Sequence, residues 1–470
     1  MSITDQYAEF CDNLTFDDLP EPVVERTKQL TLDTLGIVIG SIRSESTESI
    51  LQATRDRNID RGGATVLATG ERMGPEYASL VNGALAHSLD YDDTHREASL
   101  HPGAAVIPAA LAASEEVDAS GKEFVTAIVV GYEITCRMGM AVNPESHYDR
   151  GFHMTGTCGL FGATAAVGCL YGISKDEFIA AFGLNESQAA GSLQFLENGG
   201  WNKRVHPGFA GHLALLSNSF AKHGFVSASE PIEGVRGFLK GYSDDPHPEK
   251  AVSGLGNSYE ILDVGIKPYP CCRYMHAAID IILELVKEED ITLQDIDDVT
   301  VKIPGPGIDI VGDPTNTYPQ SLVDCQFSMP FGVALAIVNR DTGIESFFDA
   351  IEGDEVSDEL KEGIDKTTVV EADWIERVYP DEWPAEVAIT TDSNEYNRKT
   401  TYAKGEPENP LSWSEIIAKY DELVTPVFGE NTARAVRETV TDIDSLSVSD
   451  LVGALPRQGR EREGYLMEKR

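Results

Sequence analysis

The sequence predicts a mostly α-helical protein in which both ends of the chain form one large all-helical domain and a smaller α+β domain is inserted. Two observations support this prediction. Up to about residue 265, apolar residues recur at helical spacing, whereas residues 266–404 also contain runs that alternate at period two. After residue 404, two prolines precede a final helical stretch. We therefore expect a helical domain of residues 1–265 plus 405–470, and an α+β domain of residues 266–404.

The helical part of the chain is marked by apolar periodicity and by capping signals. Two prolines precede the first clear helix, and Ser174 with Glu177 matches a capping box. The run 156–171 is rich in Gly and Ala, which is typical of a helix in close contact with its neighbours. The run 64–68 reads as a short strand. The other expected helices cover residues 20–40, 47–58, 77–86, 104–113 and 122–140.

The inserted segment combines strands and helices. The runs 299–303 and 387–391 alternate between apolar and polar residues, and 399–403 is a candidate partner strand for the second. Helical patterns cover residues 275–286 and 331–338. A capping box at 412–415 then begins the C-terminal helical stretch.

The net charge of −41 is the clearest feature of the composition. It is spread along the chain and repels nucleic acid and anionic lipid, so we expect no nucleic-acid and no membrane partner. Abundant Asp and Glu with few lysines indicate a halophilic acidic protein adapted to a saline cytoplasm. We see no signal peptide, no run of eighteen uncharged apolar residues and no disulfide spacing among seven cysteines. These features predict a cytoplasmic location.

A dense polar cluster follows the helix expected at 77–86. Residues 87–101 contain three histidines, three aspartates and a threonine. If the helix continues through this run, His87, Asp90 and Thr94 share one face. His101 then arrives from a following loop, ahead of another apolar helix. Such a cluster suits proton transfer, metal binding or a capped helix end, and the cluster alone leaves these alternatives open.

Other segments place a helix start or cations next to histidines. His153 precedes a Gly-rich helix start, where backbone N–H groups can receive a carboxylate. Two further segments carry basic pairs close to histidines, and these are Lys203 with Arg204 and Lys267 with Arg273. In a chain with only 37 basic residues this arrangement suggests an anionic ligand, because Arg and Lys are the usual carboxylate partners.

Several residues in these segments also have a simple structural interpretation. We expect Asp92 and Asp93 to face water or to cap a turn, and His95 to lie on the surface. His87 fits the protein core as well as it fits a site. His206 precedes a Pro-Gly pair, so it suits a turn as well as a site.

Metal binding is the main rival to proton transfer at the first cluster. His87, Asp90 and His95 offer nitrogen and oxygen ligands, and Asp92 with Asp93 suits a divalent ion. Their spacing matches neither His-Glu-x-x-His nor an EF-hand loop, and a metal site has no need of the cations elsewhere. The sequence also lacks the Gly-rich patterns of nucleotide-binding loops. We therefore expect neither a metal nor another cofactor.

Six ordered motifs resemble the MmgE/PrpD family, which contains 2-methylcitrate dehydratase and cis-aconitate decarboxylase. The motifs are Gly83–His95, His101–Gly103, Gly151–His153, Lys203–Gly208, Lys267–Pro270 and Lys404–Leu411. The resemblance covers nearly the whole chain. It implies a large helical domain built from both chain ends, an inserted α+β lid, a homodimer, and no need for a metal or an iron–sulfur cluster.

Matched motif by motif, the resemblance implies that six residues surround a di- or tricarboxylate substrate: Asp90, Thr94, His101, His153, Lys203 and Lys267. Two departures bear on the reaction. Decarboxylase members carry a histidine where this chain has Cys272 and a tyrosine where it has Phe331. Both losses argue against cis-aconitate decarboxylation. The family also contains epimerases of dicarboxylates, so membership alone does not fix the reaction.

The predicted activity is that of a metal-independent lyase that dehydrates 2-methylcitrate or a related hydroxy-tricarboxylate, which would place it in propionate metabolism. We expect His101 or His153 to be the base and the other to protonate the departing hydroxyl, with Asp90 orienting His101. Lys203 would stabilise the developing charge. The expected substrate-binding residues are Thr94, Lys267, Arg204, Arg273 and Cys272. A cis-aconitate decarboxylase or a dicarboxylate epimerase is the alternative on the same scaffold, and a metal-dependent hydrolase is a further one.

Overall fold

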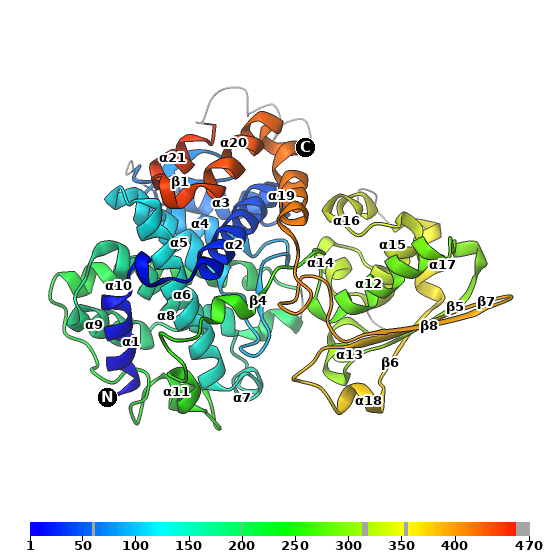
Figure 1. Ribbon diagram of the computed structural model, residues 1–470, viewed down its shortest axis with the longest axis horizontal. Helices are drawn as coiled ribbons and strands as arrows, with labels where there is room; N and C mark the ends of the chain where they lie inside the picture. The colour runs from blue at the N-terminus through cyan, green and yellow to red at the C-terminus, as the bar shows by residue number, and fades with distance from the viewer. Residues whose placement is uncertain (59–61, 198, 313–317, 352–355, 457–470) are drawn as a thin grey trace. The chain divides into compact units, whose positions relative to one another are not determined.

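The computed structural model describes residues 1–58, 62–197, 199–312, 318–351 and 356–456 (Figure 1). It is mostly helical with a separate α+β part, as the sequence predicted. The chain divides into two compact units, Met1–Val264 with Ile416–Arg470, and Gly265–Glu415. The first boundary lies one residue before the expected position, and the second lies at 415, where the sequence suggested 404.

The first unit is built from helices at both ends of the chain. In Figure 1 the C-terminal helices, in orange and red, lie beside α2 in blue, and α2 contacts α20. A short antiparallel hairpin of β1 (Ala64–Val66) and β2 (Glu71–Met73) is attached to the helices. The helices are α1 (Ile3–Asn13), α2 (Glu21–Gly40), α3 (Thr47–Arg55), α4 (Pro75–Ala86), α5 (Gly103–Val117), α6 (Gly121–Val142), α7 (Pro144–Asp149), α8 (Met154–Tyr171), α9 (Lys175–Glu186), α10 (Asn202–Lys222), α11 (Phe238–Tyr242), α19 (Trp413–Phe428), α20 (Glu430–Thr441) and α21 (Val448–Gly453).

The core of this unit is formed where α8 packs against α5, α6 and α10. The close helix contact predicted from the Gly- and Ala-rich run is confirmed at Gly162. A Cβ atom there would lie 1.8 Å from Oγ1 of Thr135 and 2.4 Å from the carbonyl oxygen of Gly131, both on α6. Only a glycine therefore allows α6 and α8 to approach so closely.

Two of these core helices, α6 and α8, are long and apolar enough to cross a membrane by length and composition. This measure admits up to two charged residues in a window of eighteen, so it is broader than the run of eighteen uncharged apolar residues that the sequence lacks. All of the apolar window of α6 and 83% of that of α8 are buried inside the protein. The apolar surface of both helices is therefore buried in the core of the first unit.

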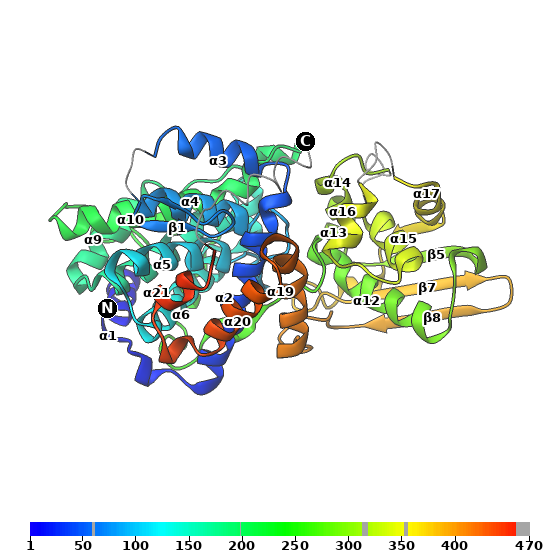
Figure 2. The same ribbon diagram turned by 90° about the horizontal axis from the view of Figure 1, so that it is seen from above.

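The second unit contains a four-stranded sheet in the order β6-β5-β7-β8. Strand β5 (Ile296–Lys302) runs parallel to β6 (Thr367–Val370) and antiparallel to β7 (Ala385–Thr391), which pairs with β8 (Glu395–Thr400). Helices α12 and α15 pack against the sheet, as Figure 2 shows. The helices of this unit are α12 (Arg273–Glu288), α13 (Gly305–Val311), α14 (Leu322–Gln326), α15 (Met329–Asn339), α16 (Ile344–Ala350), α17 (Asp358–Asp365) and α18 (Asp373–Glu376).

Candidate active site

The polar cluster that follows α4 lies in a loop. The condition under which His87, Asp90 and Thr94 would share one helical face does not hold, because α4 ends at Ala86 and His87 is its C-terminal cap. Asp90 adopts a left-handed backbone conformation with φ of 49°, which an α-helix does not accommodate. Asp is one of the few residues that tolerate this conformation, so the aspartate at position 90 is compatible with a non-helical turn there.

Asp92 is the carboxylate at the centre of this loop. Its Oδ2 atom lies 2.6 Å from Nδ1 of His87 and 3.3 Å from Nδ1 of His101. Asp92 is only 1% exposed, so the expectation that it faces water was wrong. A carboxylate favours the protonated form of a neighbouring imidazole, and it can also fix the orientation of the ring. Asp92 therefore lies where the sequence analysis had placed Asp90.

Asp93 and His95 are also buried, which corrects the expectation that they are solvated. Oδ1 of Asp93 accepts the backbone N–H of Gly103 at 3.0 Å, and Oδ2 accepts the hydroxyl of Tyr132 at 2.5 Å. Burial raises the pKa of Asp93 to about 7, although the two hydrogen bonds by themselves lower this pKa. Nδ1 of His95 accepts the backbone N–H of Ala98. Both side chains hold the loop in place next to the start of α5.

His153 joins the cluster from a different part of the chain. It is the N-terminal cap residue of α8, as the sequence predicted, and it is 3% exposed. Its ring stacks on that of His87 with centroids 5.6 Å apart, and His87 meets His101 edge to face at 4.8 Å. Burial, followed by the charges of neighbouring histidines and Lys203, holds the pKa of His153 well below its usual range.

His206 lies within helix α10 and contacts His153. The two Nδ1 atoms are 3.0 Å apart, and the ring centroids are 5.1 Å apart. The turn that the following Pro-Gly pair suggested is absent there, since α10 continues through Pro207. Burial, and then the nearby charges of His87 and Lys203, lower the pKa of His206 to about 4.

Lys203 begins the same helix and forms an ion pair with Asp90. Its side chain is 22% exposed. Thr94, at the end of the loop, is half-buried. The backbone N–H of His101 donates to the hydroxyl of Thr155 on α8 at 3.1 Å, which ties the histidine loop to the core.

Arg204 is buried next to Lys203 and has partners within the protein. Its Nη1 atom donates to the hydroxyls of Ser44 and Ser46 at 3.1 and 2.9 Å, and Nη2 lies 3.8 Å from a carboxylate oxygen of Glu45. These contacts anchor the first turns of α10 to the segment before α3. The substrate contact expected of Arg204 stays a prediction.

Three of the predicted substrate-binding residues belong to the second unit. Lys267 is buried. Cys272 is the N-terminal cap residue of α12 and donates its backbone N–H to the carbonyl of Gln326 at 2.8 Å. Arg273 forms an ion pair with Glu406, and its guanidinium carbon lies 5.4 Å from the centroid of the Trp383 ring. Their contacts with a substrate stay predictions.

Within the described part of the chain, His87, Asp92 and His101 form a group that could hold a metal ion. One ligand atom from each side chain lies within 4.8 Å of the others. This set differs from the ligands that the sequence suggested, because it includes His101 and leaves out Asp90 and His95. Two imidazoles and one carboxylate suit zinc, and the same three groups equally suit proton transfer without a metal.

The structure thus brings four histidines from three segments together with Asp92 and with the Lys203–Asp90 pair. Sequence reasoning selected His101, His153 and Lys203 for proton transfer, but it considered His87 and Asp92 only as alternative metal ligands or structural residues, and it left His206 between a turn and a site. The dense spacing of histidines was the available signal for His87 and His206. For Asp92 we find no signal that separates it from Asp93. The arrangement is suited to moving protons on an anionic ligand.

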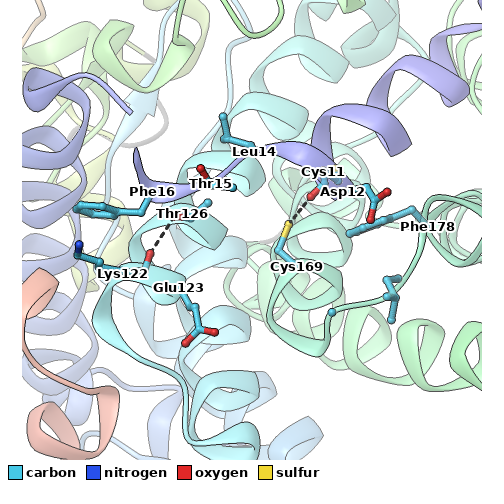
Figure 3. Close-up of a pocket in the computed structure, with 12 residues that line it drawn as sticks. Cys11, Asp12, Leu14, Thr15, Phe16, Lys122, Glu123, Thr126, Cys169 and Phe178 are labelled. Carbon is cyan, nitrogen blue, oxygen red and sulfur yellow. Dashed lines mark hydrogen bonds between the residues drawn. The ribbon is translucent and has the colours of Figure 1, made fainter. Parts of the chain in front are cut away.

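A cavity of about 310 Å³ lies elsewhere in the first unit (Figure 3). It is lined by residues of α1, α6 and α8 and their neighbours, including Phe16, Lys122 and Phe178. Cys169 and Cys11 also line it, and the Cys169 thiol donates to the backbone carbonyl of Cys11 at 3.3 Å. No histidine of the cluster lines this cavity. It is therefore separate from the candidate active site.

Fold and site define a helical protein with an inserted α+β unit and a buried cluster of histidines around a carboxylate. Two family models match the chain, the MmgE/PrpD N-terminal domain over residues 5–251 and the MmgE/PrpD C-terminal domain over residues 269–445. The chain belongs to the MmgE/PrpD family, which confirms the resemblance seen in its motifs.

Several curated relatives of this chain are named cis-aconitate decarboxylase. The chain is 27% identical over 465 residues to a cis-aconitate decarboxylase of Aspergillus terreus (strain NIH 2624 / FGSC A1156), covering 95% of this chain and 94% of the relative. It is 23% identical over 467 residues to the human cis-aconitate decarboxylase, covering 95% and 92%. A second cis-aconitate decarboxylase of Aspergillus terreus is 32% identical over 295 residues, or 60% of each chain. Decarboxylases are lyases, so these matches support a lyase of this family.

Proposed function

We propose that this protein is a metal-independent lyase that removes water from a hydroxy-tricarboxylate, with 2-methylcitrate as the first candidate substrate. The observation that carries the proposal is the contrast between two histidines of one cluster. His101 lies beside the carboxylate of Asp92, whereas His153 is buried and has a strongly lowered pKa. Elimination of water requires a base and an acid at the same time, and these settings supply one of each.

In the proposed reaction, neutral His153 takes the proton from the carbon next to a substrate carboxylate. The electron pair of that C–H bond forms the double bond and expels the hydroxyl, which leaves as water with a proton from His101. Asp92 stabilises the imidazolium form of His101 before the transfer. Lys203 stabilises the negative charge that builds on the substrate carboxylate as the proton leaves.

Decarboxylation of cis-aconitate is the second candidate, and the names of the relatives favour it. That reaction releases CO₂ and then needs one proton donor for the resulting carbanion. It does not require a neutral base such as His153. The histidine and tyrosine that decarboxylase members carry are replaced here by Cys272 and Phe331. Phe331 has no hydroxyl group and therefore offers no proton donor. Its ring is fully buried in α15 and packs against Phe347. These features favour dehydration.

The experiment compares His101→Ala and His153→Ala with the wild type on 2-methylcitrate, in molar KCl because of the strong negative charge. Each change is expected to lower kcat by about 10²–10⁴-fold, the usual contribution of a general acid or base. His223→Ala, an exposed histidine at the end of α10, is the control and keeps wild-type turnover. Near-normal turnover in both site variants would show that the proposed acid–base pair is wrong.

A further inference from the structure

The elimination described above gives His206 no role, although its ring is in contact with that of His153. The Nδ1 atoms of the two residues are 3.0 Å apart. His206 lies on α10 one turn after Lys203, so the same helix presents both side chains to the cluster. The edge of Phe195 lies against both rings, with centroids 6.4 Å from His153 and 6.0 Å from His206.

Two glycines clear the space that this contact needs. A Cβ atom at Gly156 would lie 3.1 Å from Cβ of His206 and 2.7 Å from the carbonyl oxygen of Ala190. Gly191 has a φ of 145°, and a Cβ atom there would lie 3.3 Å from Nδ1 of His206 and 3.5 Å from Cβ of His153. The carbonyl of Gly191 also accepts the backbone N–H of His153 at 2.8 Å. The backbone around the pair is thus shaped to let the two imidazoles meet.

The geometry of the contact restricts the protonation of both rings. A hydrogen bond between two Nδ1 atoms needs one Nδ1–H donor and one bare Nδ1 acceptor, so the two neutral rings must adopt complementary tautomers. Burial holds the pKa of both histidines below the ordinary value, and the groups that face them add to this effect. These groups are His87, His101 and Lys203. Both rings are therefore neutral near pH 7.

The two rings differ in their access to solvent. His153 is 3% exposed, whereas His206 is only half-buried. When His153 donates from Nδ1, its Nε2 atom is bare and can act as the base, while His206 carries its proton on Nε2. The contact is compatible with this pair of tautomers, which is the pair that leaves His153 able to act as the base.

We propose that His206 is a positioning residue that holds His153 in its basic tautomer and relays the abstracted proton to solvent. This inference rests on the proposed function. His153 takes the substrate proton on Nε2 and passes its Nδ1 proton to Nδ1 of His206, and His206 releases its Nε2 proton to water. One proton thus leaves for solvent. Because His101 gives one proton to the departing hydroxyl and regains one from solvent, the proton balance of the elimination is zero. The relay leaves both rings in the opposite tautomers. After product release, His153 loses its Nε2 proton to water, Nδ1 of His206 returns its proton to Nδ1 of His153, and His206 takes one proton from water on Nε2, which restores the base.

Two variants separate the two parts of the proposal. In His206→Asn the amide oxygen still accepts the Nδ1–H of His153 and holds the tautomer, but the amide cannot relay a proton. In His206→Ala both functions are lost. We expect kcat to fall by about 10-fold in the first variant and further in the second, with KM little changed, because relay and tautomer control act on the chemical step. Added imidazole restores part of the activity of His206→Ala.

The matched control is His212→Asn on the same helix. His212 is also half-buried, with its Nδ1 atom 3.2 Å from the carbonyl of Glu76 and its ring against Tyr77. This variant is expected to keep the wild-type kcat and pH profile. A wild-type kcat and pH profile in His206→Ala would overturn the proposal.

A readout without turnover separates failure of this inference from failure of the proposed function. In protein with ¹⁵N-labelled histidines, NMR at neutral pH should show a proton bonded to Nδ1 of His153 and shared with His206, assigned by its loss in His153→Gln. The signal should vanish in His206→Ala. If it is present but no acid is dehydrated, the proposed function is wrong while the histidine pair stands. Its absence in the wild type would overturn the pair itself.

Discussion

The Nδ1 atom of His101 lies 3.3 Å from Oδ2 of Asp92. This contact makes His101 the acid of the proposed reaction, because the buried carboxylate favours the imidazolium form. His153 lies among other histidines and a lysine, and its lowered pKa favours the neutral form. We base the proposed assignment of acid and base, which the sequence left open, on these different surroundings of the two rings.

Replacing Asp92 with Asn should lower kcat by about 10²–10⁴-fold, because an amide cannot stabilise a protonated His101. Glu260→Gln is the matched control, since Oε2 of Glu260 lies 3.4 Å from Nε2 of His95 and forms a similar pair outside the cluster. Steady-state kinetics should show the loss in the first variant and near-normal turnover in the second. Equal turnover in both variants would contradict the role of Asp92.

Lys203→Met and Arg204→Met should affect different properties although the residues are neighbours. Loss of the Lys203 ammonium should lower kcat/KM by about 10²–10³-fold, because it removes a positioned charge at the developing carboxylate. Loss of Arg204 should lower the free energy of unfolding by about 1–3 kcal/mol, because Ser44 and Ser46 lose a buried hydrogen-bond partner. Kinetics and urea denaturation measure the two effects. A raised KM with unchanged stability in Arg204→Met would instead make Arg204 a substrate ligand.

The activity should persist at pH values below the ordinary pKa of histidine. A lowered pKa means that His153 stays unprotonated, and so remains a base, at pH values below the ordinary histidine pKa of about 6.5. Phe195→Ala admits water to both rings and should raise the pKa of His153, which moves the acid limb of the kcat/KM profile to higher pH. A profile that is identical in the variant and the wild type would contradict burial as the cause.

Stability should depend on the same two histidines. In the unfolded chain they take up protons near pH 6.5, whereas in the folded protein His206 does so only near pH 4 and His153 also well below its usual value. The folded state therefore loses stability as the pH falls from 6.5 toward 4. Thermal denaturation should show a smaller loss over this range in His206→Asn than in the wild type. An unchanged pH dependence would contradict the lowered pKa of His206.

Removal of metal ions should leave the activity intact. His87, Asp92 and His101 have the geometry of a metal-binding group, so the prediction needs a direct test. The protein is dialysed against EDTA in molar KCl, its metal content is measured, and turnover is assayed before and after zinc is added back. Full activity in the metal-free protein supports acid–base catalysis by the side chains. Activity that returns only with zinc would favour the metal-dependent alternative.

The secondary structure was largely predictable, because apolar periodicity and capping residues are local signals. The helix that starts after His153 and the capping box at Ser174 appear as predicted. The strand β8 was displaced, since residues 395–400 form it and 399–403 were expected. An edge strand with alternating exposure has a weak pattern, and its pairing with β7 sets its position.

The candidate site was predictable in its residue types and less so in its geometry. Helix α4 ends at Ala86, and the loop that follows, with a positive φ at Asp90, brings Asp92 next to His101. The contact between His153 and His206 joins residues far apart in sequence, and it depends on the space left by Gly156 and Gly191. Such tertiary contacts have no local signature, so the sequence could name the histidines but not pair them.

The most direct test of the proposed dehydration is product analysis with 2-methylcitrate and cis-aconitate offered separately to the same enzyme preparation. The unsaturated acid is followed by its ultraviolet absorbance and by mass spectrometry, and CO₂ release is followed from carboxyl-labelled substrate. We predict that 2-methylcitrate loses water and that cis-aconitate releases no CO₂ above background. Release of CO₂ from cis-aconitate, with 2-methylcitrate left unchanged, would contradict the account.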